Sequence, residues 1–379
     1  MEKKFNPLIF LASLGAGWIA IIPFALMQYS VNFGEWLIKI SHIIQMFGST
    51  NMMRLYYILF AIMIVFGVLH IVLTAIFLKQ LFTRYGSKEH RDYKEDPLKN
   101  YGLITPLLSL LMTMNLVIWP IRFFIPNFAD NLQTFMLPAL IFWIILFVIT
   151  MYTSMKILKR AFEQSFDIEK INFWRLLTPF TIWMLSVVGA WIAAMSKDSQ
   201  IANTAAFFTL ISASMWVLLF LVKLITLFKK HFEDKNWLPS KYFMPSFLIV
   251  IPNITLYAIT FFRLGHYLEK TMWFHLDYYF YFVIVGGFAF ATWYLIFGLI
   301  LMKKFFQNHF FKREYYVQLR GLICPFVAYA VLWSFAYKVM WNNMVIYRVI
   351  LWSTLISIIL YWIIFKRYTS CGKRWVICE

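Results

Sequence analysis

The sequence is poor in acidic residues and in cysteine. Only 17 of its 379 residues are Asp or Glu, against 35 Lys or Arg, and no carboxylate lies deep in a long apolar run. Intramembrane carboxylates usually mark proton relays or coupled ion sites, so their absence argues against such a site. The three cysteines (Cys324, Cys371 and Cys378) form neither a disulfide framework nor a metal motif, and they leave the redox compartment undetermined.

Motifs for catalysis and cofactors are also missing. The apolar runs hold no Asp-rich diphosphate-binding motif, no His-x-x-x-His spacing and no histidine pair suited to haem. We therefore predict no enzyme activity, no cofactor and no metal. His70 is the one titratable side chain near the middle of a run, apart from tyrosines and Cys324. A packed, hydrogen-bonded histidine is the favoured interpretation there, with a proton relay as the alternative.

Apolar residues dominate the chain, at 62% hydrophobic and 14% charged, which excludes an ordinary soluble domain. Runs of roughly 20 apolar residues predict membrane-spanning helices. The links between them are too short for a further domain, so residues 1–379 form one membrane domain. The ten expected spans are 7–29, 55–79, 102–124, 133–156, 173–194, 201–228, 244–267, 277–302, 320–341 and 344–365.

The basic residues alternate in number from one link to the next. Those on the side of the N-terminus hold 27 Lys or Arg and those on the other side hold 8. By the positive-inside rule, this split predicts a multi-pass protein of the cell membrane with both termini in the cytoplasm. It also accounts for the net charge of +18 without nucleic acid, so we expect the lipid bilayer around the chain and no nucleic-acid partner.

Prolines divide the spans into two kinds, since odd-numbered spans carry eight of the twelve and even-numbered spans carry only Pro138. A proline inside a helix frees a carbonyl that must face protein or a water-filled path. The predicted fold is therefore an all-α polytopic membrane protein with ten helices in five hairpins. Kinked odd helices lie inside around a pore, and straighter even helices lie outside. The expected kinks are at Pro23, Pro106, Pro179, Pro252 and Pro325.

Small or polar residues on the odd spans are the candidates for lining this pore. They are Ser13, Gly15, Gly17, Ser109, Thr113, Thr178, Thr181, Asn253 and Thr255. The alternative for each Ser or Thr is a hydrogen bond to its own helix carbonyl four residues back. Four cations near the outer ends of spans three, five, seven and nine would attract anions: Arg122, Lys197, Arg263 and Lys338. The open alternative is that these four are interface anchors.

Three stretches resemble one family of membrane proteins. They are residues 5–17, residues 244–253 and the motif Cys-Pro-Phe-Val-Ala-Tyr-Ala at residues 324–330. With ten spans and prolines on the odd helices, the chain is similar to the tellurite-resistance/dicarboxylate transporter family, which includes the plant slow anion channels and their bacterial homologues. The resemblance implies a homotrimer with a pore in each protomer, closed by a phenylalanine of the ninth span. That residue is Phe326 on the motif, with Phe335 as the alternative.

The leading hypothesis is an anion channel that passes small inorganic anions such as chloride and is gated by this phenylalanine. The second is a secondary carrier for a small organic or sulfur-containing anion, such as a dicarboxylate or sulfite. A membrane-embedded enzyme or a scaffold is the third.

Overall fold

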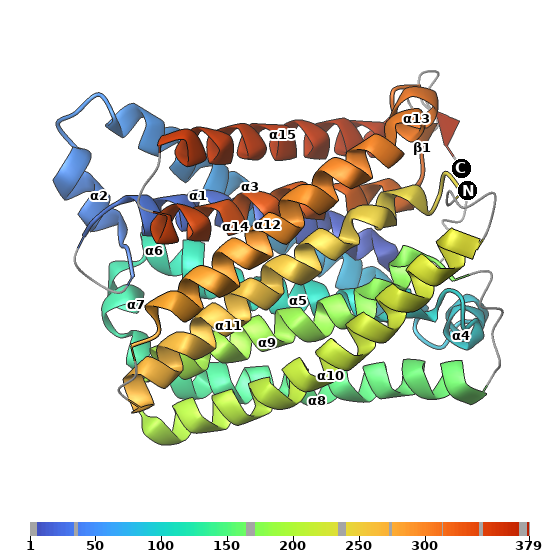
Figure 1. The fold of residues 1–379 in the computed structure, drawn as a ribbon, viewed down its shortest axis with the longest axis horizontal. Coiled ribbons are helices and arrows are strands. Elements are labelled where there is room, and N and C mark those ends of the chain that lie inside the picture. Colours follow the sequence, from blue (N-terminus) through green and yellow to red (C-terminus); the bar gives the residue numbers. More distant parts are fainter. Residues whose placement is uncertain are drawn as a thin grey trace.

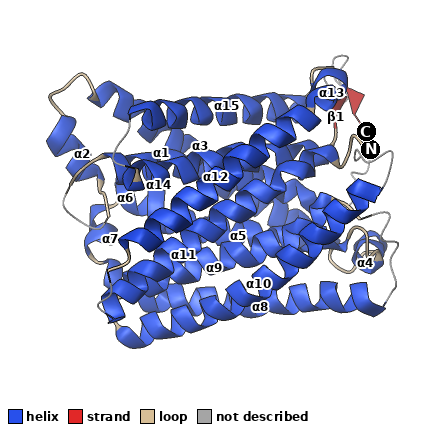
Figure 2. Ribbon diagram, viewed as in Figure 1, coloured by secondary structure: helices blue, strands red, loops and turns tan. Residues whose placement is uncertain are grey.

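Long apolar helices make up nearly all of the protein (Figure 2). The structure, a computed structural model, describes residues 6–33, 37–163, 171–233, 240–272, 275–312, 314–340, 344–370 and 377–378. Within these residues, ten helices are long and apolar enough to cross a membrane, and each overlaps one predicted span. They cover Pro7–Ser30, Met53–Arg84, Asn100–Phe124, Leu132–Glu163, Phe173–Met195, Ser199–Glu233, Met244–Met272, Asp277–Leu301, Val317–Val339 and Tyr347–Thr369. The prediction of an all-α polytopic membrane protein is thus confirmed.

Helix bounds follow the apolar runs closely. The long α-helices are α1 (Phe10–Ser30), α3 (Met53–Arg84), α5 (Thr105–Leu116), α8 (Met136–Glu163), α9 (Leu177–Met195), α10 (Ser199–Glu233), α11 (Val250–Met272), α12 (Asp277–Leu301), α14 (Ile323–Val339) and α15 (Met344–Thr369). The short ones are α2 (Ile40–Phe47), α4 (Lys88–Glu95), α6 (Arg122–Phe124), α7 (Pro126–Asp130) and α13 (Lys303–Phe305). Two short strands, β1 (Glu314–Tyr315) and β2 (Ile377–Cys378), pair in parallel.

Burial separates the odd-numbered spans from the even-numbered ones. In the most apolar window of each odd span, between 72% and 100% of the residues are buried, against 28% to 44% in the even spans. A helix that is apolar all round is stable in water only when it is fully covered, whereas in a bilayer lipid can cover it. The even spans therefore present apolar side chains outward, and the odd spans form the interior.

The inner helices form a closed ring. Helix α1 packs against α5, α5 against α9, α9 against α11, α11 against α14, and α14 against α1. The outer helices cover this ring from outside. Helix α3 lies on α1, α8 and α10 lie on α9, α12 lies on α11 and α14, and α15 lies on α14. In Figure 1, α1 begins and α15 ends at the end of the molecule that carries α4 and α13, while α2 and α7 lie at the opposite end.

Four of the five prolines expected to kink helices lie instead in a first helical turn. Pro106, Pro179, Pro252 and Pro325 each occupy the second or third residue of an α-helix. In every case a 3-10 segment precedes that helix: Asn100–Ile104, Phe173–Leu176, Met244–Ile249 or Val317–Leu322. First-turn amides have no partner within the α-helix, so a proline is tolerated there. These four prolines therefore mark the change from 3-10 to α-helix rather than a position in the interior of the α-helix.

Two prolines do lie inside a helical segment. Pro23 is within α1, and Pro120 is within the π-helical turn Val117–Ile121 that joins α5 to α6. A proline at position 23 cannot donate to the carbonyl of Ile19, four residues back. Both prolines lie on inner spans, close in sequence to residues that line the cavity described next.

Candidate functional site

The ring of inner helices encloses a small chamber, with a cavity volume of about 40 Å³. This leaves room for about three water-sized groups. Every residue that lines the chamber belongs to an odd-numbered span, and all five of those spans contribute. The lining residues are Trp18, Ile21, Phe24, Ala25, Gln28, Tyr29, Met112, Asn115, Trp119, Met184, Val187, Leu256, Ile259, Arg263, Val331 and Phe335.

Aromatic and aliphatic side chains form most of the chamber wall, and no carboxylate is among them. Asn115 turns its amide nitrogen to the carbonyl of Leu111 (3.2 Å) and to the sulfur of Met184 (3.3 Å). Trp18 is 3% exposed, and its indole N–H has no acceptor among the described residues. An ion that enters this space therefore loses most of its water and meets few polar groups.

A much larger vestibule adjoins the chamber at the end of the molecule where α1 terminates. Its cavity volume is about 570 Å³. Gln28, Tyr29, Trp119 and Arg263 line both spaces, so they stand at the boundary between them. The other vestibule residues are Ser30, Val31, Asn32, Phe33, Leu37, Ala194, Met195, Phe262, His266, Glu269 and Lys338.

Arg263 is the cation at this boundary. It is only 7% exposed, and its guanidinium carbon lies 4.2 Å from the ring centre of Trp119 and 6.0 Å from that of Phe335. Its Nε has no hydrogen-bond partner, and no carboxylate lies within ion-pair distance among the described residues. Cation–π contacts offset only part of the cost of burying a charge. Arg263 is therefore a buried cation that has no anionic partner in the part of the chain that the structure describes.

Two aromatic rings meet directly beside Arg263. Phe335 of α14 packs against Tyr29 of α1 with ring centres 4.5 Å apart, and its edge meets Phe262 of α11 at 5.4 Å. Phe335, the alternative gate residue, thus lines the chamber at the boundary with the vestibule. Phe326 is partly buried against the apolar core and is not among the residues that line the chamber or the vestibule.

The four predicted outer cations divide between two depressions. Arg263 and Lys338 line the vestibule, whereas Arg122 and Lys197 line a neighbouring depression of about 260 Å³. Arg122 is almost fully buried and donates to the carbonyls of Ile118 (3.1 Å) and Ile38 (2.8 Å). It therefore helps to hold the chain that follows α1. The structure does not bring the four cations together in one ring.

Three of the predicted pore-lining residues belong instead to a buried hydrogen-bond network around His70. The Nδ1 of His70 lies 2.7 Å from the carbonyl of Ser13, and its Nε2 lies 2.8 Å from the hydroxyl of Thr113. The hydroxyl of Ser109 lies 2.8 Å from that of Ser13 and 2.9 Å from that of Thr74. This network joins α1, α3 and α5. His70 is packed between these helices with both ring nitrogens hydrogen-bonded, as the favoured interpretation expected.

Gly15 and Gly17 serve close helix contacts rather than a pore. A Cβ added at Gly17 would lie 2.7 Å from Cγ of Met112 and 2.8 Å from Nδ1 of His70. One at Gly15 would lie 3.0 Å from the side chain of Ile323. Glycine at these positions therefore lets α1 approach α3, α5 and α14.

The remaining pore candidates are buried between helices, and three of the four form hydrogen bonds there. The hydroxyl of Thr181 donates to the carbonyl of Leu177 (3.0 Å), as the alternative interpretation expected. The amide of Asn253 donates to Ile249 and accepts from the indole of Trp216 (3.2 Å), while Thr255 donates to Ala328 (3.4 Å). Thr178 is buried, and its hydroxyl has no hydrogen-bond partner among the residues that the structure describes. None of the nine candidates lines the chamber or the vestibule.

Aromatic residues of the inner spans are what the sequence-based selection missed. Trp18, Tyr29 and Trp119 line the chamber, but the sequence-based candidates for lining the pore were all small or polar residues. A signal was present: all three lie on odd-numbered spans, within a few residues of Pro23 or Pro120. Asn115 was a second missed signal, as an amide in the middle of an apolar run.

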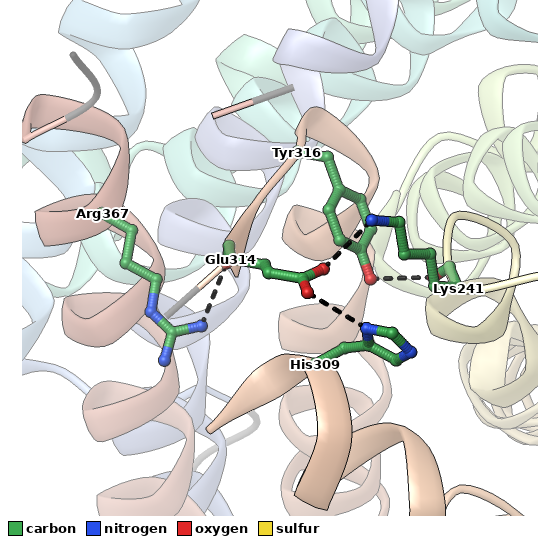
Figure 3. A network of polar contacts seen from close by, with 5 residues as sticks. All are labelled: Lys241, His309, Glu314, Tyr316 and Arg367. Atoms are coloured by element: carbon green, nitrogen blue, oxygen red, sulfur yellow. Dashed lines mark hydrogen bonds and ion pairs between the residues drawn. The ribbon is translucent and has the colours of Figure 1, made fainter. Parts of the chain in front are cut away.

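A polar cluster ties the opposite end of the molecule together (Figure 3). The carboxylate of Glu314 in β1 lies 3.3 Å from Nζ of Lys241 and 3.2 Å from Nδ1 of His309. Burial alone would raise the pKa of this carboxyl, but the bonds from His309 and Lys241 outweigh it and hold that pKa below its usual value. The hydroxyl of Tyr316 donates to the carbonyl of Lys241, and Arg367 of α15 donates to the carbonyl of Glu314. The cluster therefore joins three chain segments.

Comparison with known proteins adds no relative. No family model matches the chain, and no match was found among curated proteins or among solved structures.

Proposed function

We propose that the protein conducts small inorganic anions, such as chloride, through a path within each protomer that runs from the vestibule into the chamber. The observation that carries this proposal is Arg263, a buried cation without an anionic partner at the boundary of the two spaces. A fixed positive charge at a narrow entrance attracts anions and penalises cations. The absence of carboxylates among the chamber residues supports the same sign of charge.

The aromatic pair at the boundary is the proposed gate. Phe335 and Tyr29 close the chamber beside Arg263, and a rotation of Phe335 would widen this point. Phe335 therefore replaces Phe326 as the gate residue of the proposal, because Phe326 is not among the lining residues of either space.

Nitrate or chloride efflux from proteoliposomes tests this function. The wild type should show slow efflux above that of empty liposomes, and Phe335→Ala should raise it about tenfold. Phe326→Ala is the matched control, since it removes the same side chain from the same helix, and it should leave the efflux near that of the wild type. Equal efflux from all three proteins and from empty liposomes would contradict anion conduction.

A carrier for an organic or sulfur-containing anion is the second candidate. His266 and Glu269, paired at 3.0 Å, line the vestibule and give it a titratable pair that proton coupling would need. Uptake that saturates and collapses when an ionophore dissipates the proton gradient would favour the carrier. Uptake that follows the anion's own gradient would favour the channel.

The proposed assembly and orientation rest on the outer helices and on the charge pattern. A homotrimer of the tellurite-resistance/dicarboxylate transporter type would cover part of the apolar face that the even-numbered spans present. Mass measurement of the protein in native detergent tests this oligomeric state. Labelling of single cysteines, introduced at Lys88 and at Lys197, tests whether the termini are cytoplasmic, because only Lys197→Cys should react with an impermeant reagent outside the cell.

A further inference from the structure

The vestibule holds two cations that form no ion pair with an acidic side chain of the described residues. Neither Arg263 nor Lys338 forms an ion pair with a carboxylate in the described part of the chain. Glu269 is the one acid among the vestibule residues, and it is engaged by His266 at 3.0 Å and by the backbone N–H of Leu276 at 3.3 Å. The vestibule therefore has a surplus of positive charge.

Both cations lie beside the aromatic pair proposed as the gate. The guanidinium carbon of Arg263 lies 6.0 Å from the ring centre of Phe335, and Nζ of Lys338 lies 5.8 Å from that of Tyr29. Phe335 and Lys338 are three residues apart on α14, so their side chains project from the same face of that helix. An anion between the two cations would lie beside Tyr29, with the exposed amide of Asn32 in the same space.

The two spaces differ in which anions they can hold. The vestibule, at about 570 Å³, admits an oxyanion together with part of its water, whereas the chamber offers about 40 Å³. The cost of removing an ion from water grows with the square of its charge. The mostly apolar chamber wall repays little of that cost for a divalent anion.

We propose that the vestibule is a binding site for a tetrahedral divalent oxyanion, such as sulfate, which occupies it without entering the chamber and blocks the path for monovalent anions. Arg263 and Lys338 hold the anion, and Tyr29, which lines both the vestibule and the chamber, lies at the inner end of the site. The blocking part rests on the proposed anion conduction, whereas the binding part does not.

Binding is tested first, on the purified protein in detergent at constant ionic strength. Sulfate, with gluconate as the reference anion, should raise the temperature of unfolding of the wild type with a saturating concentration dependence. Lys338→Gln should raise the sulfate concentration for half of this shift about fivefold or more, because one of two charges is lost. Lys197→Gln, which removes a cation at the same end but outside the vestibule, should leave it unchanged.

These comparisons separate the site from general effects of sulfate on folded proteins. The proposal would be overturned if sulfate raised the unfolding temperature of the wild type and of Lys338→Gln with the same concentration dependence. It would also be overturned if Lys197→Gln weakened the response to sulfate as much as Lys338→Gln does. The second arm measures nitrate efflux with sulfate added on the vestibule side, where efflux should fall as the site fills. Efflux that sulfate does not change, or uptake of labelled sulfate itself, would overturn the block. If the wild type binds sulfate but conducts no anion, the proposed function is contradicted and the proposed binding site still stands.

Discussion

The ring of Phe335 lies against that of Tyr29, with centres 4.5 Å apart, at the point where the vestibule meets the chamber. The contact joins α1 to α14, the first and last members of the ring of inner helices. If this contact is the proposed gate, movement of either ring opens the path, and the two side chains are expected to act as a unit.

Tyr29→Ala should raise anion efflux to about the level of Phe335→Ala, and the double variant should exceed neither single variant by much. The two rings close one opening, so removing the second adds little once the first is gone. Tyr29→Phe keeps the ring and should behave like the wild type. Efflux from proteoliposomes measures all four proteins, and additive increases in the double variant would contradict a shared closure.

Arg263→Gln should lower nitrate efflux about tenfold and weaken the preference for anions over potassium. The substitution removes the one cation among the described residues that line the chamber, while glutamine keeps a polar side chain of similar length. Arg263→Lys should retain part of the efflux because it retains the charge. Reversal potentials in planar bilayers under a salt gradient report the preference, and an unchanged reversal potential in Arg263→Gln would count against the role of this charge.

Gly17→Ala should destabilise the folded protein by about 1–3 kcal/mol, because the new methyl group would overlap Met112 and His70. Gly67→Ala in α3 is the matched control, since an added Cβ there meets nothing within 4 Å. That substitution should be neutral or slightly stabilising, as alanine is the better helix former. Thermal unfolding in detergent measures both, and equal midpoints would mean that the contact of α1 with α3 and α5 is looser than described.

Loss of the charge on Glu314 should destabilise the protein at neutral pH. The destabilisation should be smaller in acid. Because the folded state holds the pKa of this carboxyl below its usual value, the cluster's contribution is present above the unfolded value and is lost as the pH falls through the folded one. The difference in unfolding midpoint between the wild type and Glu314→Gln should therefore shrink as the pH is lowered below about 4.

Glu163→Gln provides the comparison for that experiment. Glu163 forms only an exposed ion pair with Lys159 at 3.4 Å, and such pairs contribute little. Its substitution should have a small effect at every pH. A midpoint difference for Glu314→Gln that stays constant from neutral to acid pH would show that the carboxylate does not stabilise the cluster through its charge.

The sequence predicted the ten spans because length and apolarity are local properties, and a bilayer demands both of every crossing. Proline counts separated the odd spans from the even ones, which differ in burial as that division expected. Proline position was misjudged at Pro325 and its three counterparts, because a run of apolar residues does not reveal where a 3-10 segment becomes an α-helix.

The site was harder to predict, since it depends on which face of each inner helix turns inward. Ser13, Ser109 and Thr113 were chosen because they are polar, but polar groups buried between helices find partners there, and these three join around His70. Trp18 and Trp119 were not among the candidates because only small or polar residues were selected, and aromatic residues of membrane helices are enriched at the interfaces with water. Arg263 was identified by its charge and by its place near the end of a span, and in the structure it lies at the boundary between the vestibule and the chamber.

The inner and outer spans also differ in how apolar they are, which affects how the chain enters the membrane during synthesis. The third, fifth, seventh and ninth spans are each less apolar than every even-numbered span. Taken singly, these four would partition into lipid less readily than the segments that follow them. A ribosome-bound translocon would therefore be expected to release the spans in pairs. Each less apolar odd-numbered span would stay in the translocon until the more apolar span that follows it has been synthesised.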